Sequence, residues 1–164
     1  MAVAFNADEI LQIAIQIERN GARFYHRAAG IVGDADVKRM LEKLAGMEDS
    51  HEQTFQQMRN ELSAAQKTPT TFDPEGQSGQ YLNALADRRI FDVTADPTEK
   101  LRSNETPDQI FRMALDAEKN SIVFYLGMRE MVPQKLGKDD VDRIIREEMS
   151  HITIITQAFG HRPS

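Results

Sequence analysis

Residues 14–25 read AIQIERNGARFY, and residues 114–125 read ALDAEKNSIVFY. The two stretches share an alanine, a glutamate and a Phe-Tyr pair, at Ala14/Ala114, Glu18/Glu118, Phe24/Phe124 and Tyr25/Tyr125. Thirty residues after each glutamate comes a second shared element, which is Glu48-Asp49-Ser50-His51 in the first half and Glu148-Met149-Ser150-His151 in the second. Each half therefore supplies one glutamate followed by a Glu-x-x-His motif, and this repeat decides the fold.

Around both copies, apolar residues recur three and four positions apart, which is the spacing of a helix. The pattern predicts four long helices, over residues 7–29, 35–62, 107–132 and 140–159. Asn6 with Glu9, and Thr106 with Gln109, form capping boxes that start the first and third helices. Short turns join the first helix to the second and the third to the fourth. Each half is therefore predicted to be an antiparallel helical hairpin.

The positions predicted to face inward carry glutamate and histidine within otherwise apolar seams. They are Leu11, Ile15, Glu18, Ala22, Tyr25 and Ala29 in the first helix, Val37, Leu41, Leu44, Glu48, His51, Phe55, Met58 and Leu62 in the second, Phe111, Leu115, Glu118, Ile122 and Tyr125 in the third, and Val141, Ile144, Glu148, His151 and Ile155 in the fourth. Charged groups at such positions need a partner that offsets the cost of burying them.

Residues 63–105 form a long connection between the halves, with a short helix predicted over residues 81–90. A crossover of this length lets two hairpins lie side by side. The sequence thus predicts an all-α four-helix bundle of two antiparallel hairpins joined by a long crossover that contains a short helix. Residues 1–164 are expected to form one domain, because neither hairpin alone could bury its apolar stripe.

A second apolar stripe leaves two interpretations open. It comprises Ile10, Ile17 and Phe24 in the first helix, with Ile13 beside it, and Ile145, Ile152 and Phe159 in the fourth. The crossover could cover these faces. Alternatively they form a subunit interface, because large exposed apolar patches are rare on monomers, and the chain is then a homodimer.

Composition excludes several classes of protein. The 164 residues are 40% hydrophobic and 28% charged, as in an ordinary globular domain. The sequence has no stripe of basic residues of the kind that binds nucleic acid. It also has no apolar run long enough to span a membrane. The N-terminus lacks the features of a secretory signal, so we expect a cytoplasmic protein. The chain has no cysteine, which excludes a cysteine-ligated metal module within it.

The repeated motif predicts a site for two metal ions. Residues three apart on a helix share a face, so each Glu-x-x-His can bind one ion. A glutamate from each of the other two helices completes the coordination spheres of the ions or bridges the ions. Two divalent cations would balance the four carboxylates. The predicted ligands are Glu18, Glu48, His51, Glu118, Glu148 and His151. Oxygen-rich spheres with one imidazole each suit iron or manganese, and zinc is a further candidate.

Residues beside the predicted ligands receive different assignments. Tyr25 and Tyr125 lie two turns beyond Glu18 and Glu118 on the same face, so they are predicted to donate hydrogen bonds to ligand carboxylates. Glu52 and Glu147 directly neighbour motif residues, but they are predicted to point off the seam into solvent.

The doubled Glu…Phe-Tyr and Glu-x-x-His pattern resembles the ferritin-like di-iron superfamily, and most closely its rubrerythrin-like branch. The resemblance covers nearly the whole chain outside the crossover. It implies two iron ions held by the six ligands named above, a diferrous centre oxidised by hydrogen peroxide or dioxygen, and a dimeric or larger assembly.

Two departures from rubrerythrins bear on the implied function. Without cysteine the chain has no rubredoxin module, so electrons would come from an external donor. Ser121 stands where rubrerythrins carry an additional carboxylate associated with peroxide reduction. The leading interpretation is a di-iron oxidoreductase that reduces peroxide or dioxygen. The alternatives are a ferritin-like ferroxidase that handles iron and a non-catalytic helical scaffold stabilised by metal.

Overall fold

The computed structural model describes residues 6–63, 80–81, 96–132 and 134–160, the side chains of 159–160 aside. Most of these residues lie in four long helices, which are α1 (Ala7–Ala29), α2 (Ala35–Asn60), α4 (Pro107–Met131) and α5 (Lys138–Gly160). Two short 3₁₀ helices, η2 (Pro97–Lys100) and η3 (Gln134–Leu136), accompany them, and no strand occurs within these ranges. The predicted all-α fold class is therefore confirmed.

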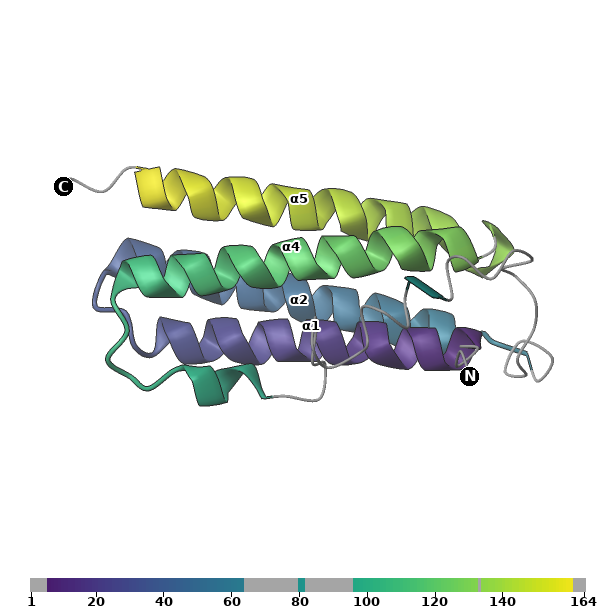
Figure 1. Ribbon diagram of the computed structural model, residues 1–164, viewed down its shortest axis with the longest axis horizontal. Helices are drawn as coiled ribbons and strands as arrows, with labels where there is room; N and C mark the ends of the chain where they lie inside the picture. Colours follow the sequence, from purple (N-terminus) through teal and green to yellow (C-terminus); the bar gives the residue numbers. More distant parts are fainter. Residues whose placement is uncertain (1–5, 64–79, 82–95, 133, 161–164) are drawn as a thin grey trace.

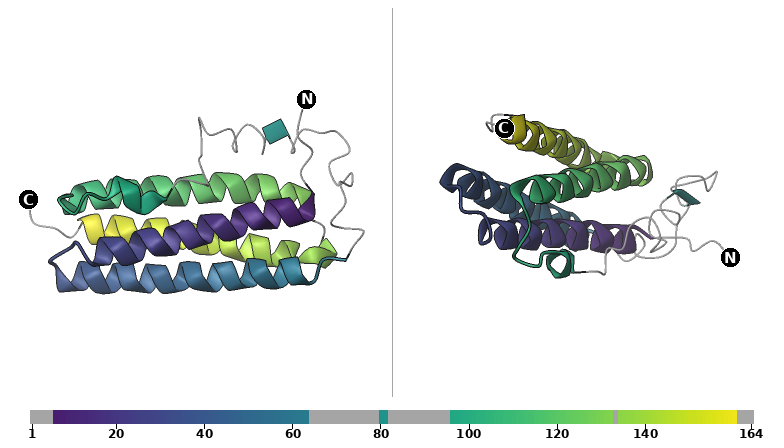
Figure 2. Two further views of the ribbon diagram at one scale, coloured as in Figure 1. Left: turned by 90° about the horizontal axis from the view of Figure 1, so that it is seen from below. Right: turned by 60° about the vertical axis from the view of Figure 1, so that its left-hand side comes forward.

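The long helices form a bundle in which neighbouring helices run antiparallel (Figure 1). α1 packs against α2 and α4, and α5 packs against α4 and α2. Figure 2 shows the hairpin of α1 and α2 lying against the hairpin of α4 and α5. Because α2 ends at one end of the bundle and α4 begins at the other, the connection must travel the length of α4. That length is about 38 Å for 25 residues.

Side-chain caps begin α1, α2 and α4, and those of α1 and α4 are the predicted capping boxes. The Asn6 side chain accepts a hydrogen bond from the Glu9 amide at 2.8 Å, and the Asn6 amide donates to the Glu9 carboxylate at 3.0 Å. Thr106 and Gln109 make the same reciprocal pair. Asp34 is the cap of α2 and accepts from two amides of the first turn.

The helix bounds differ from the predicted ones by at most two residues. α5 begins at Lys138 rather than at residue 140, because Gly137 takes a left-handed conformation, with φ of +94°, that turns the chain into the helix earlier. The predicted short helix at residues 81–90 is described only at Tyr81, which is helical together with Gln80, and the remainder lies outside the described residues. η2 and η3 were not predicted.

The interior consists of two apolar clusters with polar residues between them. One lies where α1 and α5 begin and α2 and α4 end, and it includes Ile15, Phe55, Met128 and Ile144. The other lies at the opposite end and includes Leu41, Leu44, Phe111 and Ile155. The motif glutamates and histidines lie at the middle of the four helices, so apolar packing closes the bundle on both sides of them.

All positions predicted to face inward on α1, α2 and α5 are buried. On α4, Phe111, Glu118 and Tyr125 are buried, but Leu115 and Ile122 are only half-buried. Ile110, Ala114, Phe124 and Met128 are buried although they were not among the predicted inward positions. The buried face of α4 is therefore displaced from the predicted one, and Leu115 and Ile122 lie at its edge.

The second apolar stripe is largely covered within the chain itself. Ile10, Ile17 and Phe24 are each no more than 5% exposed. Phe24 shares an apolar cluster with Leu101, which directly follows η2. An ion pair of 2.8 Å between Arg23 and Asp96 fastens the same segment to α1. The end of the crossover thus covers part of α1, as one of the two interpretations predicted.

Other parts of that stripe leave the second interpretation untested. Ile13 and Ile152 are half-buried, Ile145 is buried, and the side chain of Phe159 lies outside the described residues. The predicted homodimer stays a prediction. None of the described helices is long and apolar enough to cross a membrane.

Candidate metal centre

The bundle brings all six predicted ligands together at its centre. α1 supplies Glu18, α4 supplies Glu118, and α2 and α5 each supply a Glu-x-x-His pair. None of the six is more than 4% exposed. Each Glu-x-x-His pair lies on one face of its helix because its members are three residues apart.

The six residues form two overlapping groups that could each hold a metal ion. One group is Glu18, Glu48, His51 and Glu148, and the other is Glu48, Glu118, Glu148 and His151. Within each group, one ligand atom from every residue lies within 4.8 Å of the others. Glu48 and Glu148 belong to both groups, so their carboxylates could contact either ion if two were bound. Glu18 and Glu118, which the sequence left as completing or bridging ligands, each belong to one group.

The Nδ1 atom of each histidine points toward these carboxylates. His51 Nδ1 lies 2.8 Å from a Glu148 oxygen and 3.2 Å from a Glu18 oxygen. His151 Nδ1 lies 3.2 Å from Glu48 and 3.4 Å from Glu118. The two imidazole rings stack with centroids 5.5 Å apart and planes 14° from parallel. Adding one hundred to each residue number of the first half gives the corresponding residue of the second half, and the contacts of His51 match those of His151. The centre therefore has pseudo-two-fold symmetry.

The two tyrosines hydrogen-bond across this symmetry. Tyr25 donates its hydroxyl hydrogen to Glu118, and Tyr125 donates to Glu18. Each tyrosine therefore hydrogen-bonds to a glutamate from the other half of the chain, and that glutamate belongs to only one of the two ligand groups. Burial, followed by the negative charge of Glu118 for Tyr25 and of Glu18 for Tyr125, raises the pKa of both hydroxyls well above its usual value. Both hydroxyls thus remain donors at neutral pH.

The electrostatics of the centre call for positive charge. Burial and the neighbouring carboxylates raise the pKa of Glu48 and Glu148 well above the usual value. Burial lowers the pKa of His51, but its close contacts with the Glu148 and Glu18 carboxylates outweigh burial and raise the pKa to about 11. The pKa of Glu118 is instead lowered, because its close contacts with His151 and Glu148 outweigh its burial. Protons held by this cluster occupy the place that divalent cations would take.

Several buried polar atoms are of the types that bind a metal. Among the described residues, Glu118 Oε2, both carboxylate oxygens of Glu148 and both ring nitrogens of His151 make no hydrogen bond of regular geometry, although they lie close to one another and to His51. Such atoms are rare in a folded protein unless a ligand satisfies them. Their types, carboxylate oxygen and imidazole nitrogen, are those that bind iron, manganese or zinc. The residues present therefore fit a pair of metal ions. Binding of those ions by these six residues stays a prediction.

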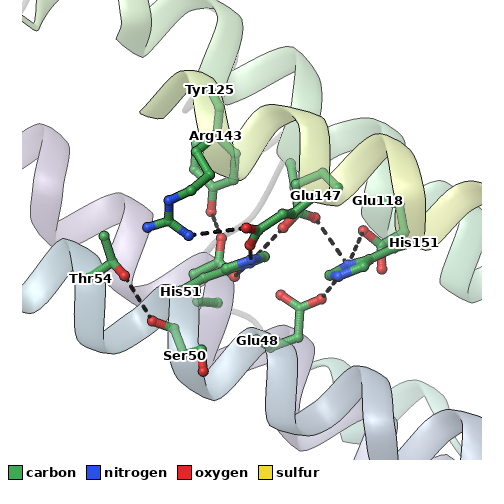
Figure 3. Close-up of polar contacts among 12 residues, drawn as sticks. Glu48, Ser50, His51, Thr54, Glu118, Tyr125, Arg143, Glu147 and His151 are labelled. Carbon is green, nitrogen blue, oxygen red and sulfur yellow. Dashed lines mark hydrogen bonds and ion pairs between the residues drawn. The ribbon is translucent and has the colours of Figure 1, made fainter. Parts of the chain in front are cut away.

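Glu147 was predicted to face solvent; its side chain is 35% exposed, but it also makes a contact that the prediction missed. Its Oε2 atom lies 2.6 Å from His51 Nε2, the ring nitrogen that faces away from the centre (Figure 3). Its other oxygen accepts a hydrogen bond of 3.1 Å from Arg143. Although Glu147 immediately precedes Glu148 on α5, it reaches across to α2. Glu52, which is 24% exposed, forms an ion pair with Arg19 instead of contacting the cluster.

Sequence reasoning also missed Gly21, the counterpart of Ser121. A Cβ atom at Gly21 would lie 3.1 Å from Glu48 Oε2, so the glycine leaves the space that the Glu48 carboxylate occupies. Ser121 donates its hydroxyl hydrogen to the Ala117 carbonyl of its own helix, so its hydrogen-bond donor is used away from the centre. The shift of one hundred that relates the halves, applied to every position near a ligand, would have drawn attention to this pair.

Comparison with known proteins agrees with the fold. The family model described as Rubrerythrin matches residues 3–59, which span the first hairpin. The crystal structure of a candidate ferritin-like diiron-carboxylate protein from Thermotoga maritima superposes with a TM-score of 0.75 at 22% sequence identity, covering 94% of each chain. No curated protein matches the sequence. The resemblance to the ferritin-like di-iron superfamily is thus confirmed, and the chain has the ferritin-like fold.

Proposed function

We propose that this protein is a di-iron oxidoreductase that reduces hydrogen peroxide or dioxygen with electrons from an external donor. The observation that carries the proposal is the pair of buried ligand groups that share Glu48 and Glu148. Two shared carboxylates favour two ions held close together over two independent sites. Paired ions suit the chemistry, since reducing one peroxide to two waters takes two electrons and two protons.

The ligand set favours iron. Four carboxylates and two imidazoles, with no thiolate in the chain, are typical of iron or manganese sites. Glu18 and His51 would hold one ion, Glu118 and His151 the other, and Glu48 and Glu148 both. A bound diferrous pair would supply the two electrons. The resemblance to rubrerythrin over the first hairpin points to the same metal.

The chain's own residues prepare the centre for this chemistry. Tyr25 and Tyr125 fix the carboxylates of Glu118 and Glu18 by hydrogen bonding, which orients them before metal arrives. The apolar clusters at both ends of the bundle exclude bulk water. Glu48 and Glu148 hold protons in the metal-free state, because burial raises their pKa, and would release them as cations bind.

We propose that the electron donor lies outside this chain. A cysteine-ligated module cannot be part of this chain, which has no cysteine. No described residue other than the tyrosines near the cluster offers a redox-active side chain to it. A soluble reductant or partner protein therefore returns the centre to its ferrous state in this proposal.

The test is stopped-flow absorbance of protein loaded anaerobically with ferrous iron and mixed either with peroxide or with air-saturated buffer. The proposal predicts rapid oxidation at two irons per chain. Faster reaction with peroxide indicates a peroxidase, and faster reaction with air indicates an oxidase or a ferroxidase. Glu52→Gln, a change outside the cluster, should behave as the parent. Bound iron that reacts with neither oxidant would contradict the proposal and favour a metal-stabilised scaffold.

A further inference from the structure

The two halves of the centre differ outside the ligands themselves. Every ligand in one half has its counterpart one hundred residues away, and so do the two tyrosines. The position before the second-motif glutamate breaks the pattern, because it is Glu147 in α5 but Met47 in α2. This difference in sequence affects the Nε2 atom of each histidine, which faces away from the centre.

His51 has a fixed hydrogen bond on that side. Its Nε2 atom lies 2.6 Å from Glu147 Oε2, and the other oxygen of Glu147 accepts from Arg143 at 3.1 Å. Arg143 is itself held near Asp140, at 3.4 Å. Figure 3 shows this chain running from Arg143 through Glu147 to the imidazole. The Glu147 carboxylate thus lies between two donors and has little freedom to turn.

His151 has no such partner. Its Nε2 atom makes no hydrogen bond to any residue that the structure describes, although the side chain is fully buried. Pseudo-two-fold symmetry puts position 47 where it would face His151 as Glu147 faces His51. Met47 is half-buried and carries no strong acceptor. Lys43, the counterpart of Arg143, lies one turn before Met47, which offers no carboxylate to it as Glu147 does to Arg143.

The difference affects metal binding through the proton on the outer nitrogen. When Nδ1 binds a metal, the remaining proton lies on Nε2 and needs an acceptor. A carboxylate there fixes the tautomer and the ring orientation and makes the imidazole a better ligand, and removing such a carboxylate weakens metal affinity by about 10- to 100-fold. For His151 the same proton would be buried without an acceptor among the described residues, which costs free energy.

We infer that the two ion positions are unequal. The ion held by Glu18, Glu48, His51 and Glu148 binds first and more tightly, and Glu147 is the positioning residue that makes it so. The second ion, at Glu118 and His151, binds more weakly by a factor of about 10 to 100. This inference rests on the proposed metal centre. It predicts ordered loading and an intermediate form with a single ion.

The test is an anaerobic titration of the full chain with ferrous iron against a competing chelator, which gives two stepwise dissociation constants. The parent should show constants about 10- to 100-fold apart. Mössbauer spectra provide a second measurement, because ordered loading gives one ferrous doublet after one equivalent of iron and a different second doublet after two. A single equivalent that divides between two doublets would overturn the inference.

Three variants separate positioning from general effects of charge. Glu147→Leu should weaken the tighter constant and bring the two together. Glu147→Gln keeps an oxygen acceptor for His51 and should retain most of the difference. Met47→Glu should tighten the weaker constant, because it supplies the missing acceptor near Lys43. Glu52→Leu removes a surface carboxylate of similar exposure, 24% against 35% for Glu147, and should change neither constant.

The outcomes distinguish this inference from the proposed function. If the parent binds no iron, the metal centre itself is refuted. If the parent binds two ions with equal constants, or if Glu147→Leu weakens both constants alike, the centre stands and the inference fails. An unchanged weaker constant in Met47→Glu, in a variant that is folded by circular dichroism, also counts against it.

Discussion

At the scale of single residues, Glu48 and Glu148 connect the two halves of the centre. Each is buried, each belongs to both ligand groups, and burial together with neighbouring charge raises the pKa of each. A carboxyl group in this position is unfavourable in the metal-free protein and valuable once cations are present. Stability and metal binding therefore make opposite demands on the same two side chains.

Glu48→Gln should expose that conflict. The amide cannot bridge two cations, so iron binding is expected to weaken at both positions, whereas Glu118→Gln should affect one. The metal-free Glu48→Gln protein should be more stable by about 1–3 kcal/mol, because a neutral group replaces an acid in a buried site. Iron titration and urea unfolding measure the two effects. A metal-free variant less stable than the parent would contradict this account of Glu48.

Gly21 offers a second residue-scale prediction. Alanine favours a helix by about 1 kcal/mol over glycine, but the new methyl group at position 21 would press on the Glu48 carboxylate at 3.1 Å. Gly21→Ala should therefore weaken iron binding at both positions while gaining little stability. Gly46→Ala is the matched control, since nothing lies within 4 Å of its Cβ position. That control should gain stability and bind iron as the parent does.

The positions of the candidate ligands and of the two tyrosines beside them could be predicted from the sequence, but the contact of Glu147 with His51 could not. A glutamate or histidine in an apolar helical seam has only one direction to point, so Glu18 and His51 follow from periodicity. Glu147 follows no such rule, because a side chain one step off the seam can turn to solvent or reach a neighbouring helix. Only the distance between α5 and α2 decides that choice.

At the scale of elements, the connection between the hairpins contributes to the bundle near η2. Leu101 is 4% exposed and shares a cluster with Phe24, while Asp96 pairs with Arg23 and Ser103 accepts from Arg27 at 2.7 Å. These contacts close the α1 face from outside the four helices. They lie at the end of the bundle away from the beginning of α1.

Leu101→Ala should destabilise the protein by about 2–4 kcal/mol, since it empties a buried site. The metal ligands are in other elements, so iron stoichiometry should stay at the parent value in the folded variant. Thermal unfolding and iron analysis measure both quantities. A variant that keeps full stability would show that η2 does not close the α1 face in solution.

Long helices were easier to predict than short ones. α1 and α4 carry capping boxes and over twenty residues of helical spacing, which leave few alternatives. η2 has four residues and buries none of them, so periodicity could not reveal it. Its signal was the Asp96-Pro97 pair, because the aspartate accepts from the Thr98 amide and proline suits a first turn. On α4 the predicted seam was partly wrong, because Ile110, Phe124 and Met128 are buried while Leu115 and Ile122 are only half-buried.

At the scale of the whole molecule, the charge of the centre should govern how stability depends on pH. The pKa of His51 is raised to about 11 in the folded protein, against 6.5 ordinarily. The folded state therefore holds a proton that the unfolded state releases between these values. This contribution to stability is complete below pH 6.5 and is lost as pH rises toward 11. The raised pKa of Glu48 and of Glu148 acts in the same direction from a lower pH.

The metal-free protein should accordingly lose stability between pH 7 and pH 9, by up to about 1.4 kcal/mol per pH unit for each proton involved. Urea unfolding at several pH values measures the slope. His51→Gln removes the titrating group and should flatten it. A metal-free parent whose stability rises over this range would contradict the charge assignment at His51.

The whole bundle also positions the candidate metal centre, because all four helices contribute residues to the two ligand groups. The most direct test of the paired centre is anomalous diffraction from crystals grown anaerobically with ferrous iron. Two iron peaks per chain, each beside one histidine and both touching Glu48 and Glu148, are predicted. A single peak, or iron bound only at surface carboxylates, would contradict the paired metal centre.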